Sequence, residues 1–323
     1  MTSARGRPIV IAHRAASGYL PEHTLPGVVA AYLLGADYIE QDVVLTSDSI
    51  PIVLHDIYLD STTDVATVFP ARCRDDGRYY AMDFTLAEIK QLEVVERRQA
   101  NGDAVFPDRF PVVNLGLRIP TLSEEINLIE GLNRTRQQSI GFYIELKAPR
   151  LHKAAGLDIA GVLLDVLARH GLHDKPDRVY LQCFDPDTLR RLAEQSLGLP
   201  LVQLIADNDW QETPGVDYDD MQTPQGLAQV AEYADGIGPW IPQLFSTDGL
   251  ALSPLATHAR ALELAIHPYT LRADELLLGA PTFDALQARL FIDARVDGAF
   301  TDFVDLTRKF IDTHISQNGD QTP

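Results

Sequence analysis

Ionisable residues gather within the first sixty positions of the chain, directly after short apolar runs. His13 and Arg14 follow the apolar run Pro8–Ala12, and His55 follows a second apolar run, Ile50–Leu54. A run that is apolar on both faces is typical of a strand covered on both sides, and α/β proteins carry functional side chains where such strands end. Imidazoles titrate near neutral pH, so the two histidines could supply one general base and one general acid.

Carboxylates with regular spacing indicate a cation site. Glu40 and Asp42 stand two apart in the expected strand Tyr38–Val44, so their side chains point to the same face. Glu145 and Lys147 close a later strand in the same way. Three carboxylates form an oxygen-only, strongly anionic cage, which suits Ca²⁺ or Mg²⁺ better than zinc.

The same residues predict a phosphate as the group that reacts. An anionic substrate would be repelled by the carboxylates unless a cation neutralised them, and Arg14 and Lys147 could then contact a phosphate. Cleavage of a phosphodiester needs a base for the attacking hydroxyl and an acid for the leaving oxygen, which are tasks for His13 and His55. The sequence does not distinguish the base from the acid.

Simpler interpretations exist for each of these residues. A histidine at a strand end is more often a core or surface residue than a catalyst, and carboxylates two apart often form a solvated face. Lys147 could pair with Glu145 as a structural ion pair. What favours the chemical interpretation is that all these residue types occur together beside buried strands.

The elements that must position these residues alternate between strand and helix, which predicts an α/β protein with a parallel sheet. Thr121 with Glu124, Asp185 with Pro186, and Thr223 with Pro224 mark helix starts. Eight strand–helix pairs predict a TIM (β/α)8 barrel, with a doubly wound open sheet as the alternative. The expected strands are Ile9–Ala12, Tyr38–Val44, Ile140–Leu146, Val179–Phe184, Leu201–Ile205, Gly236–Gly238, Glu263–His267 and Gly298–Thr301.

One segment interrupts this alternation. Residues 57–119 follow the second strand and its hairpin and contain a turn-rich stretch and a short helix, Thr85–Leu92. Connections of this length are usually functional. We therefore expect a single domain, 1–323, in which residues 57–119 are a small insertion over the barrel rim.

Composition excludes several classes of protein. The chain of 323 residues has 27 basic and 46 acidic residues, a net charge of −19, which argues against a nucleic-acid or anionic-membrane binder. Cys73 and Cys183 have no metal-ligand spacing, and no apolar run is long enough to span a membrane. As it stands the sequence shows no secretory leader, which predicts a cytoplasmic protein, or a periplasmic one if a leader has been removed. The oligomeric state stays open.

The motifs together resemble those of a known family, the glycerophosphodiester phosphodiesterases. The family's HRG, PENT, E-x-D, HD and E-x-K motifs are similar to His13-Arg14, Pro21-Glu22-His23-Thr24, Glu40-x-Asp42, His55-Asp56 and Glu145-x-Lys147. The resemblance covers essentially the whole chain. Later segments resemble the bacterial periplasmic-type branch, namely Tyr180–Asp185, Leu201–Ile205, Ala234–Pro239, His267–Thr270 and Asp297–Phe303.

This resemblance implies a TIM barrel that hydrolyses small glycerophosphodiesters to an alcohol and sn-glycerol 3-phosphate with one divalent cation, Ca²⁺ or Mg²⁺. It implies metal ligands at Glu40, Asp42 and Glu145, an acid–base pair at His13 and His55, and phosphate contacts at Arg14 and Lys147. Two residues depart from the family motifs: Ala15 replaces the usual Gly, and His23 the usual Asn. These departures concern the loop and not the reaction.

Further side chains are expected to line the substrate site, although aromatic core packing is an equal alternative for several of them. They are Glu22, Gln182, Phe184, Trp240, Tyr269 and Phe303.

Two alternative functions are kept. The first is a phospholipase-like phosphodiesterase that acts on lysolipids or phosphoinositides, which the acidic charge and the lack of a basic amphipathic helix disfavour. The second is a non-catalytic metal- or phosphate-binding barrel, which the presence of both histidines disfavours.

Overall fold

The computed structural model describes residues 7–195, 198–246, 248–249 and 251–315. Residues 1–6, on which the expectation about a leader depends, lie outside these ranges. Within the described ranges, no helix is both long enough and apolar enough to cross a membrane.

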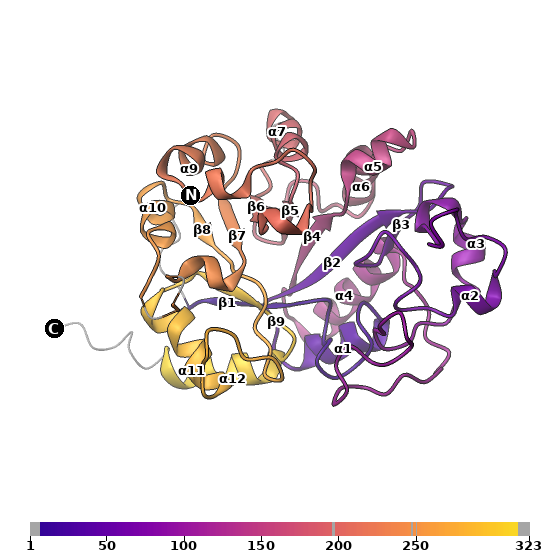
Figure 1. Cartoon of the computed structure of the whole chain (residues 1–323), viewed down its shortest axis with the longest axis horizontal. Helices are drawn as coiled ribbons and strands as arrows, with labels where there is room; N and C mark the ends of the chain where they lie inside the picture. Colours follow the sequence, from indigo (N-terminus) through magenta and orange to yellow (C-terminus); the bar gives the residue numbers. More distant parts are fainter. Residues whose placement is uncertain (1–6, 196–197, 247, 250, 316–323) are drawn as a thin grey trace.

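A ring of eight parallel strands forms the centre of the molecule, and helices surround it (Figure 1). The strand order is β8-β7-β6-β5-β4-β2-β1-β9. The prediction of a barrel is therefore confirmed, and the alternative of a doubly wound open sheet is wrong. The strands are β1 (Ile9–Ala12), β2 (Tyr38–Leu45), β4 (Gly141–Leu146), β5 (Val179–Cys183), β6 (Leu201–Ile205), β7 (Gly236–Pro239), β8 (Ala265–Ile266) and β9 (Gly298–Thr301).

The seam between β8 and β9 is closed mainly by residues that follow β8 and pair with β9. The backbone N–H of Phe300 donates to the carbonyl of Pro268, and that of Leu271 donates to the carbonyl of Phe300. β8 is shorter than predicted, because Glu263 has a φ of 59° and Pro268 has no N–H to donate.

Helices cover the outside of the ring and bury a continuous apolar core against the strands. The predicted N-terminal caps are present: the Thr121 side chain and Glu124 form a capping box, and Asp185 and Thr223 accept from backbone N–H groups. The helices of the ring are α1 (Leu25–Leu33), α4 (Leu122–Arg136), α5 (Pro149–Ala154), α6 (Ile159–Arg169), α7 (Pro186–Glu194), α8 (Tyr218–Met221), α9 (Pro224–Val230), α10 (Leu255–Ala261), α11 (Phe283–Ala288) and α12 (Val304–His314). Short 3₁₀ turns, η2 (Asn208–Trp210) and η3 (Ile241–Leu244), and a π turn, η4 (Arg289–Asp293), complete this layer.

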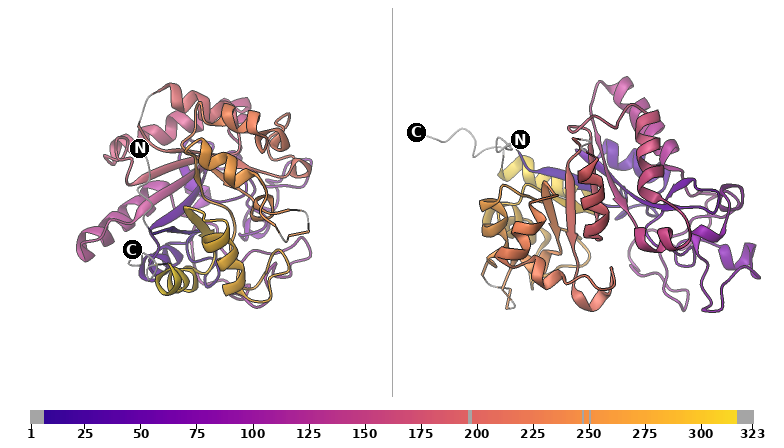
Figure 2. Two further views of the ribbon diagram at one scale, coloured as in Figure 1. Left: turned by 90° about the vertical axis from the view of Figure 1, so that its left-hand side faces the viewer. Right: turned by 90° about the horizontal axis from the view of Figure 1, so that it is seen from above.

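The segment between β3 (Pro51–Val53) and α4 has an apolar core of its own. β3 pairs antiparallel with β2 and leads into α2 (Val65–Val68), η1 (Ala81–Asp83) and α3 (Leu86–Ile89). α2 and α3 lie on the side of the molecule opposite α10 to α12 (Figures 1 and 2). Their core is a cluster separate from that of the barrel and includes Leu59, Phe84, Leu92 and Ile119. We call residues 57–119 the insertion.

Candidate active site

Three buried carboxylates meet at the carboxyl end of two neighbouring strands. Asp42 on β2 lies directly beside Glu145 on β4, and Glu40 precedes Asp42 by two residues on the same face. One carboxylate oxygen from each lies within 4.8 Å of the other two. Strand alternation and register thus bring together residues that are up to 105 positions apart in the chain.

Hydrogen bonds orient these carboxylates without neutralising them. Glu40 accepts from the backbone N–H of Arg14 at 2.8 Å and from Nε2 of Gln182 at 3.0 Å. Burial, together with repulsion from Asp42 and Glu145, raises the pKa of Glu40 well above its usual value. Burial also raises the pKa of Glu145 to about 8, although Lys147 opposes that shift.

Asp42 is held differently, by a residue of the preceding loop. Burial opposes its ionisation, but the hydrogen bond from His23, with Nε2 2.7 Å from Asp42 Oδ2, lowers the pKa of Asp42 well below its usual value. Asp42 Oδ1 is buried and has no hydrogen-bond partner in the described part of the chain. The sequence comparison treated His23 only as a loop departure, whereas the structure places it against a candidate ligand.

The two histidines face this cluster from opposite loops. His13 follows β1, and its Nε2 lies 3.9 Å from Glu40 Oε2. His55 follows β3, and its Nε2 lies 3.5 Å from Lys147 Nζ. Lys147 also pairs with Glu145 at 2.8 Å, so the structural ion pair considered above is present at the edge of the cluster.

Each histidine ring is held at its other nitrogen by an aspartate. His13 Nδ1 lies 2.6 Å from Asp302 Oδ1, and His55 Nδ1 lies 2.6 Å from Asp56 Oδ1. Burial is the main cause that lowers the pKa of His13 to about 4, and burial with Arg14 and Lys147 lowers that of His55 to about 3. A neutral imidazole that donates from Nδ1 leaves the Nε2 lone pair free on the side of the cluster.

Sequence reasoning assigned no role to these two aspartates, although signals for both were available. Asp56 follows His55 directly, and Asp302 stands one position after the carboxyl end of β9. In a barrel of this kind, the carboxyl end of every strand faces the same rim.

Several residues of the loop after β1 have a left-handed backbone conformation. This conformation explains why the family usually has Gly and Asn where this chain has Ala15 and His23. Arg14, Ala15 and His23 have φ values of 51°, 68° and 53°. Glycine adopts this conformation without strain, which accounts for the usual residue at the position of Ala15, and Asn tolerates it better than most residues. The Arg14 side chain pairs with Glu22 at 3.2 Å and lies 3.8 Å from Asp42.

The structure places the expected lining residues in different surroundings: Glu22 and Gln182 make polar contacts, and the aromatic residues pack against other rings. Glu22 is bound by Arg14 and Arg97, and Gln182 reaches Glu40. Phe184 packs edge-on against Tyr269, and Trp240 against Trp210. Phe303 packs edge-on against Tyr19, beside the loop that follows β1. The aromatic residues therefore make packing contacts, and their place in the lining of the substrate site stays a prediction.

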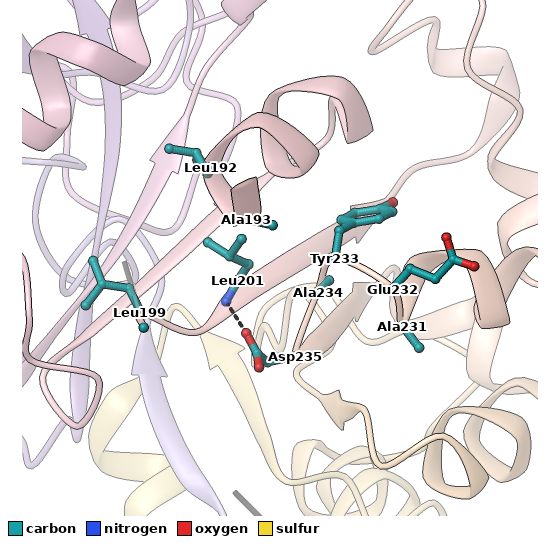
Figure 3. A pocket seen from close by; sticks show the side chains of 10 residues that line it. Leu192, Ala193, Leu199, Leu201, Ala231, Glu232, Tyr233, Ala234 and Asp235 are labelled. Carbon is teal, nitrogen blue, oxygen red and sulfur yellow. Dashed lines mark hydrogen bonds between the residues drawn. The ribbon is translucent and has the colours of Figure 1, made fainter. Parts of the chain in front are cut away.

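A hollow of about 260 Å³ lies at the other end of the strands (Figure 3). It is lined by Leu192, Leu199 and Tyr233, and across it the backbone N–H of Leu201 donates to Asp235 at 2.9 Å. It contains none of the residues predicted to do chemistry.

Comparison with known proteins agrees with this arrangement. The model of the "Glycerophosphoryl diester phosphodiesterase family" matches residues 13–306. A glycerophosphodiester phosphodiesterase of Haemophilus influenzae is 40% identical over 96% of this chain and 91% of its own length. A Silicibacter pomeroyi protein assigned to the glycerophosphoryl diester phosphodiesterases has a crystal structure that is 25% identical, with a TM-score of 0.72 over 97% of this chain and 95% of its own.

A second solved structure carries a ligand. It is an Oleispira antarctica phosphodiesterase in complex with the product sn-glycerol-3-phosphate, 21% identical with a TM-score of 0.65 over 95% of this chain and 97% of its own. The family match, the curated relative and the barrel lead to one conclusion. The chain belongs to the glycerophosphoryl diester phosphodiesterase family, and the prediction of a phosphoric diester hydrolase is confirmed.

Proposed function

We propose that the protein hydrolyses small glycerophosphodiesters to an alcohol and sn-glycerol 3-phosphate, with a divalent cation at the carboxylate cluster and His13 and His55 as the acid–base pair. The observation that carries this proposal is the orientation of the two imidazoles. Each has Nδ1 on an aspartate and Nε2 towards the same group of charges. The product named for the Oleispira structure supports the same outcome.

The carboxylate cluster fits a hard divalent cation. Its donors are all oxygens, one of them is buried without a partner, and burial makes the negative charges of Glu40 and Glu145 unfavourable. We infer that Glu40, Asp42 and Glu145 hold Ca²⁺ or Mg²⁺. When bound, the cation would act as a Lewis acid that polarises a phosphoryl oxygen.

The side chains of the chain itself perform the proton transfers. One imidazole takes the proton of the attacking hydroxyl at its Nε2. The other, protonated on both ring nitrogens beside the anionic phosphate, donates its Nε2 proton to the leaving oxygen as the P–O bond breaks. The aspartate behind each ring fixes the tautomer and stabilises the imidazolium form. Arg14 lies 3.8 Å from Asp42 and Lys147 pairs with Glu145, so both cations border the cluster, where they can bind phosphate oxygens.

A coupled assay for released glycerol 3-phosphate tests the proposal. Glycerophosphocholine, glycerophosphoethanolamine and a lysolipid are compared with EDTA present and after each metal is added back. We expect turnover of the first two, loss with EDTA and recovery with Ca²⁺ or Mg²⁺. Unchanged turnover in EDTA would contradict the role of the cation, and preference for the lysolipid would favour the phospholipase-like alternative.

Substitution tests the histidines in the same assay. His13→Ala and His55→Ala should each lower kcat by about 100-fold or more, because each removes one proton-transfer group. His173→Ala is the matched control, since His173 is exposed on a loop away from the rim. Wild-type turnover in either rim variant would reassign the role of that histidine.

A further inference from the structure

Two arginines of the insertion reach the barrel rim and contact the aspartates behind the histidines. The first is Arg97. Its Nε and Nη2 donate to the two carboxylate oxygens of Glu22 at 2.8 and 2.7 Å, and its Nη1 donates to Asp56 Oδ2 at 2.7 Å. One guanidinium thus links the loop after β1 to the aspartate that holds His55.

Arg109 makes the same pattern on the other side of the site. Its Nε and Nη2 donate to the two oxygens of Asp274 at 2.7 and 3.0 Å, and its Nη2 also lies 2.7 Å from Asp302 Oδ2. Only 5% of its side chain is exposed, and the guanidinium stacks on Phe106 with 3.7 Å to the ring centroid. This guanidinium links the loop after β8 to the aspartate that holds His13.

Backbone hydrogen bonds within the insertion hold these two arginines in place. The backbone N–H groups of Val95 and Arg98, on either side of Arg97, donate to the carbonyls of Thr62 and Ser61. The N–H of Arg109 donates to the carbonyl of Phe106, which closes the turn that carries both residues of the stack. Arginine suits this task better than lysine, because its planar fork can bind one carboxylate with two hydrogen bonds and still reach a second.

We propose that Arg97 and Arg109 are positioning residues through which the insertion holds both acid–base histidines in place. This inference rests on the proposed function, because it assigns the acid–base work to His13 and His55. Neither arginine needs to touch the substrate: each acts through an aspartate. The insertion then contributes to catalysis by holding the two histidines in position.

The two arginines should differ in importance. Asp302 has a second guanidinium, since Arg272 Nε lies 3.0 Å from its Oδ2. Among the described residues, Asp56 receives a Ser61 hydroxyl and His55 in addition to Arg97, and no second guanidinium. We therefore expect Arg97→Ala to cost more turnover than Arg109→Ala.

Steady-state kinetics of the two alanine variants test the inference, with glycerophosphocholine as substrate and metal present. We expect kcat to fall by about 10- to 100-fold, the range for partners one step removed from a functional group, while KM changes by no more than about twofold. Arg118→Ala is the matched control: it lies in the same insertion, but its side chain contacts Glu93 and the carbonyl of Leu92. It should retain wild-type kcat.

Rescue separates positioning from a general structural role. Guanidinium ion, added far below concentrations that unfold the protein, should restore part of kcat in Arg97→Ala and Arg109→Ala and none in His55→Ala. Arg97→Lys and Arg109→Lys keep the charge without the fork and should remain impaired. If an alanine variant does not fold, its lysine variant and the Nδ1 proton signal of its histidine in NMR spectra give the readout instead.

The outcomes distinguish this inference from the proposed function. Loss of turnover in the histidine variants combined with wild-type kcat in both arginine variants would overturn the inference and leave the function intact. A change confined to KM, or folded variants that guanidinium does not rescue, would also overturn it. Retained turnover in the histidine variants would instead count against the proposed function.

Discussion

Two sets of carboxylates share one rim of this barrel, and they differ in what balances their charge. Glu22, Asp56 and Asp302 each contact at least one arginine, and although burial opposes ionisation, these partners and the histidines lower the pKa of all three. We call them the paired set. Glu40, Asp42 and Glu145, the cluster, accept no hydrogen bond from an arginine side chain in the described part of the chain. Their nearest cations are Lys147, 2.8 Å from Glu145, and Arg14, 3.8 Å from Asp42, and burial raises the pKa of Glu40 and Glu145.

This difference indicates that the paired set positions the imidazoles and that the cluster binds the metal ion. Carboxylates that already carry a guanidinium can hold an imidazole without attracting a metal ion. Three buried carboxylates whose charge Lys147 and Arg14 balance only in part are destabilising until a further cation binds, as is usual for a metal site without its ion. Breaking either set should therefore give a different phenotype, and the predictions below run from the largest effect to the smallest.

Removal of one charge from the cluster should have the largest effect on activity. Glu40→Gln should lower kcat by about 1,000-fold and abolish stimulation by Ca²⁺ or Mg²⁺, because a Lewis acid is worth several kcal/mol in the transition state. Glu125→Gln is the control: Glu125 is also buried, but it lies on α4 near Gln41, which points to the face of β2 opposite Glu40 and Asp42. A metal response that survives Glu40→Gln would show that the cluster is not the cation site.

Neutralisation within the paired set should cost less and should spare metal binding. Asp56→Asn and Asp302→Asn should each lower kcat by about 100-fold, because an amide can fix the wrong imidazole tautomer. Thermal shift on metal addition should remain as in the wild type. Asp305→Asn serves for comparison, since Asp305 accepts from the Tyr19 hydroxyl and not from a histidine.

The stability of the folded protein should depend on both pH and metal, because both act on Glu145. The pKa of Glu145 rises from 4.5 to about 8 in the folded protein, so the metal-free fold binds its proton more tightly than the unfolded chain does. Its contribution to stability is therefore present at low pH and is lost as the pH rises from about 4.5 through about 8. The melting temperature of the metal-free protein should fall between about pH 6.5 and 8.

Saturation with Ca²⁺ or Mg²⁺ should remove this slope. At 100 times the dissociation constant a bound ion contributes about 2.7 kcal/mol, or roughly 5 °C in melting temperature. Melting curves across pH, with and without metal, provide the measurement. An identical slope in both series would contradict the assignment of Glu145 as a ligand.

Glu96 lies near the paired set but accepts no hydrogen bond from an arginine side chain in the described ranges. Its substitution should have the smallest effect. Glu96 is buried, its Oε2 has no hydrogen-bond partner in the described ranges, and burial with repulsion from Glu22 raises its pKa from 4.5 to about 7. The folded state therefore loses stability from this group as the pH rises through about 7. Glu96→Gln should stabilise the protein by about 1 to 2 kcal/mol at pH 8 and leave it unchanged near pH 5, as denaturant titrations at both values would show.

The cluster was predictable from sequence because its geometry is local. Glu40 and Asp42 share a face by strand alternation, and Glu145 joins them through the parallel register of β2 and β4. The barrel followed from repeated strand–helix alternation. Even there, β8 was predicted too long, since its ends depend on the backbone at Glu263 and on Pro268.

The arginine partners of the paired set were beyond such reasoning. Arg97 meets Glu22, and Arg109 meets Asp302, across 75 and 193 positions. Both arginines lie in irregular chain, where no periodicity tells which way a side chain points. Their contacts depend on how the insertion folds and docks, which no local pattern encodes.

The separate core of the insertion has a consequence for how the enzyme fails. This small apolar cluster is separate from the barrel core, although it includes Val44 of β2. We therefore expect heat or mild denaturant to open the insertion while the ring of strands persists. Such partial opening would withdraw both guanidinium groups at once. Catalysis should therefore disappear at a lower temperature than helical circular dichroism, and cooling should restore it without complete refolding.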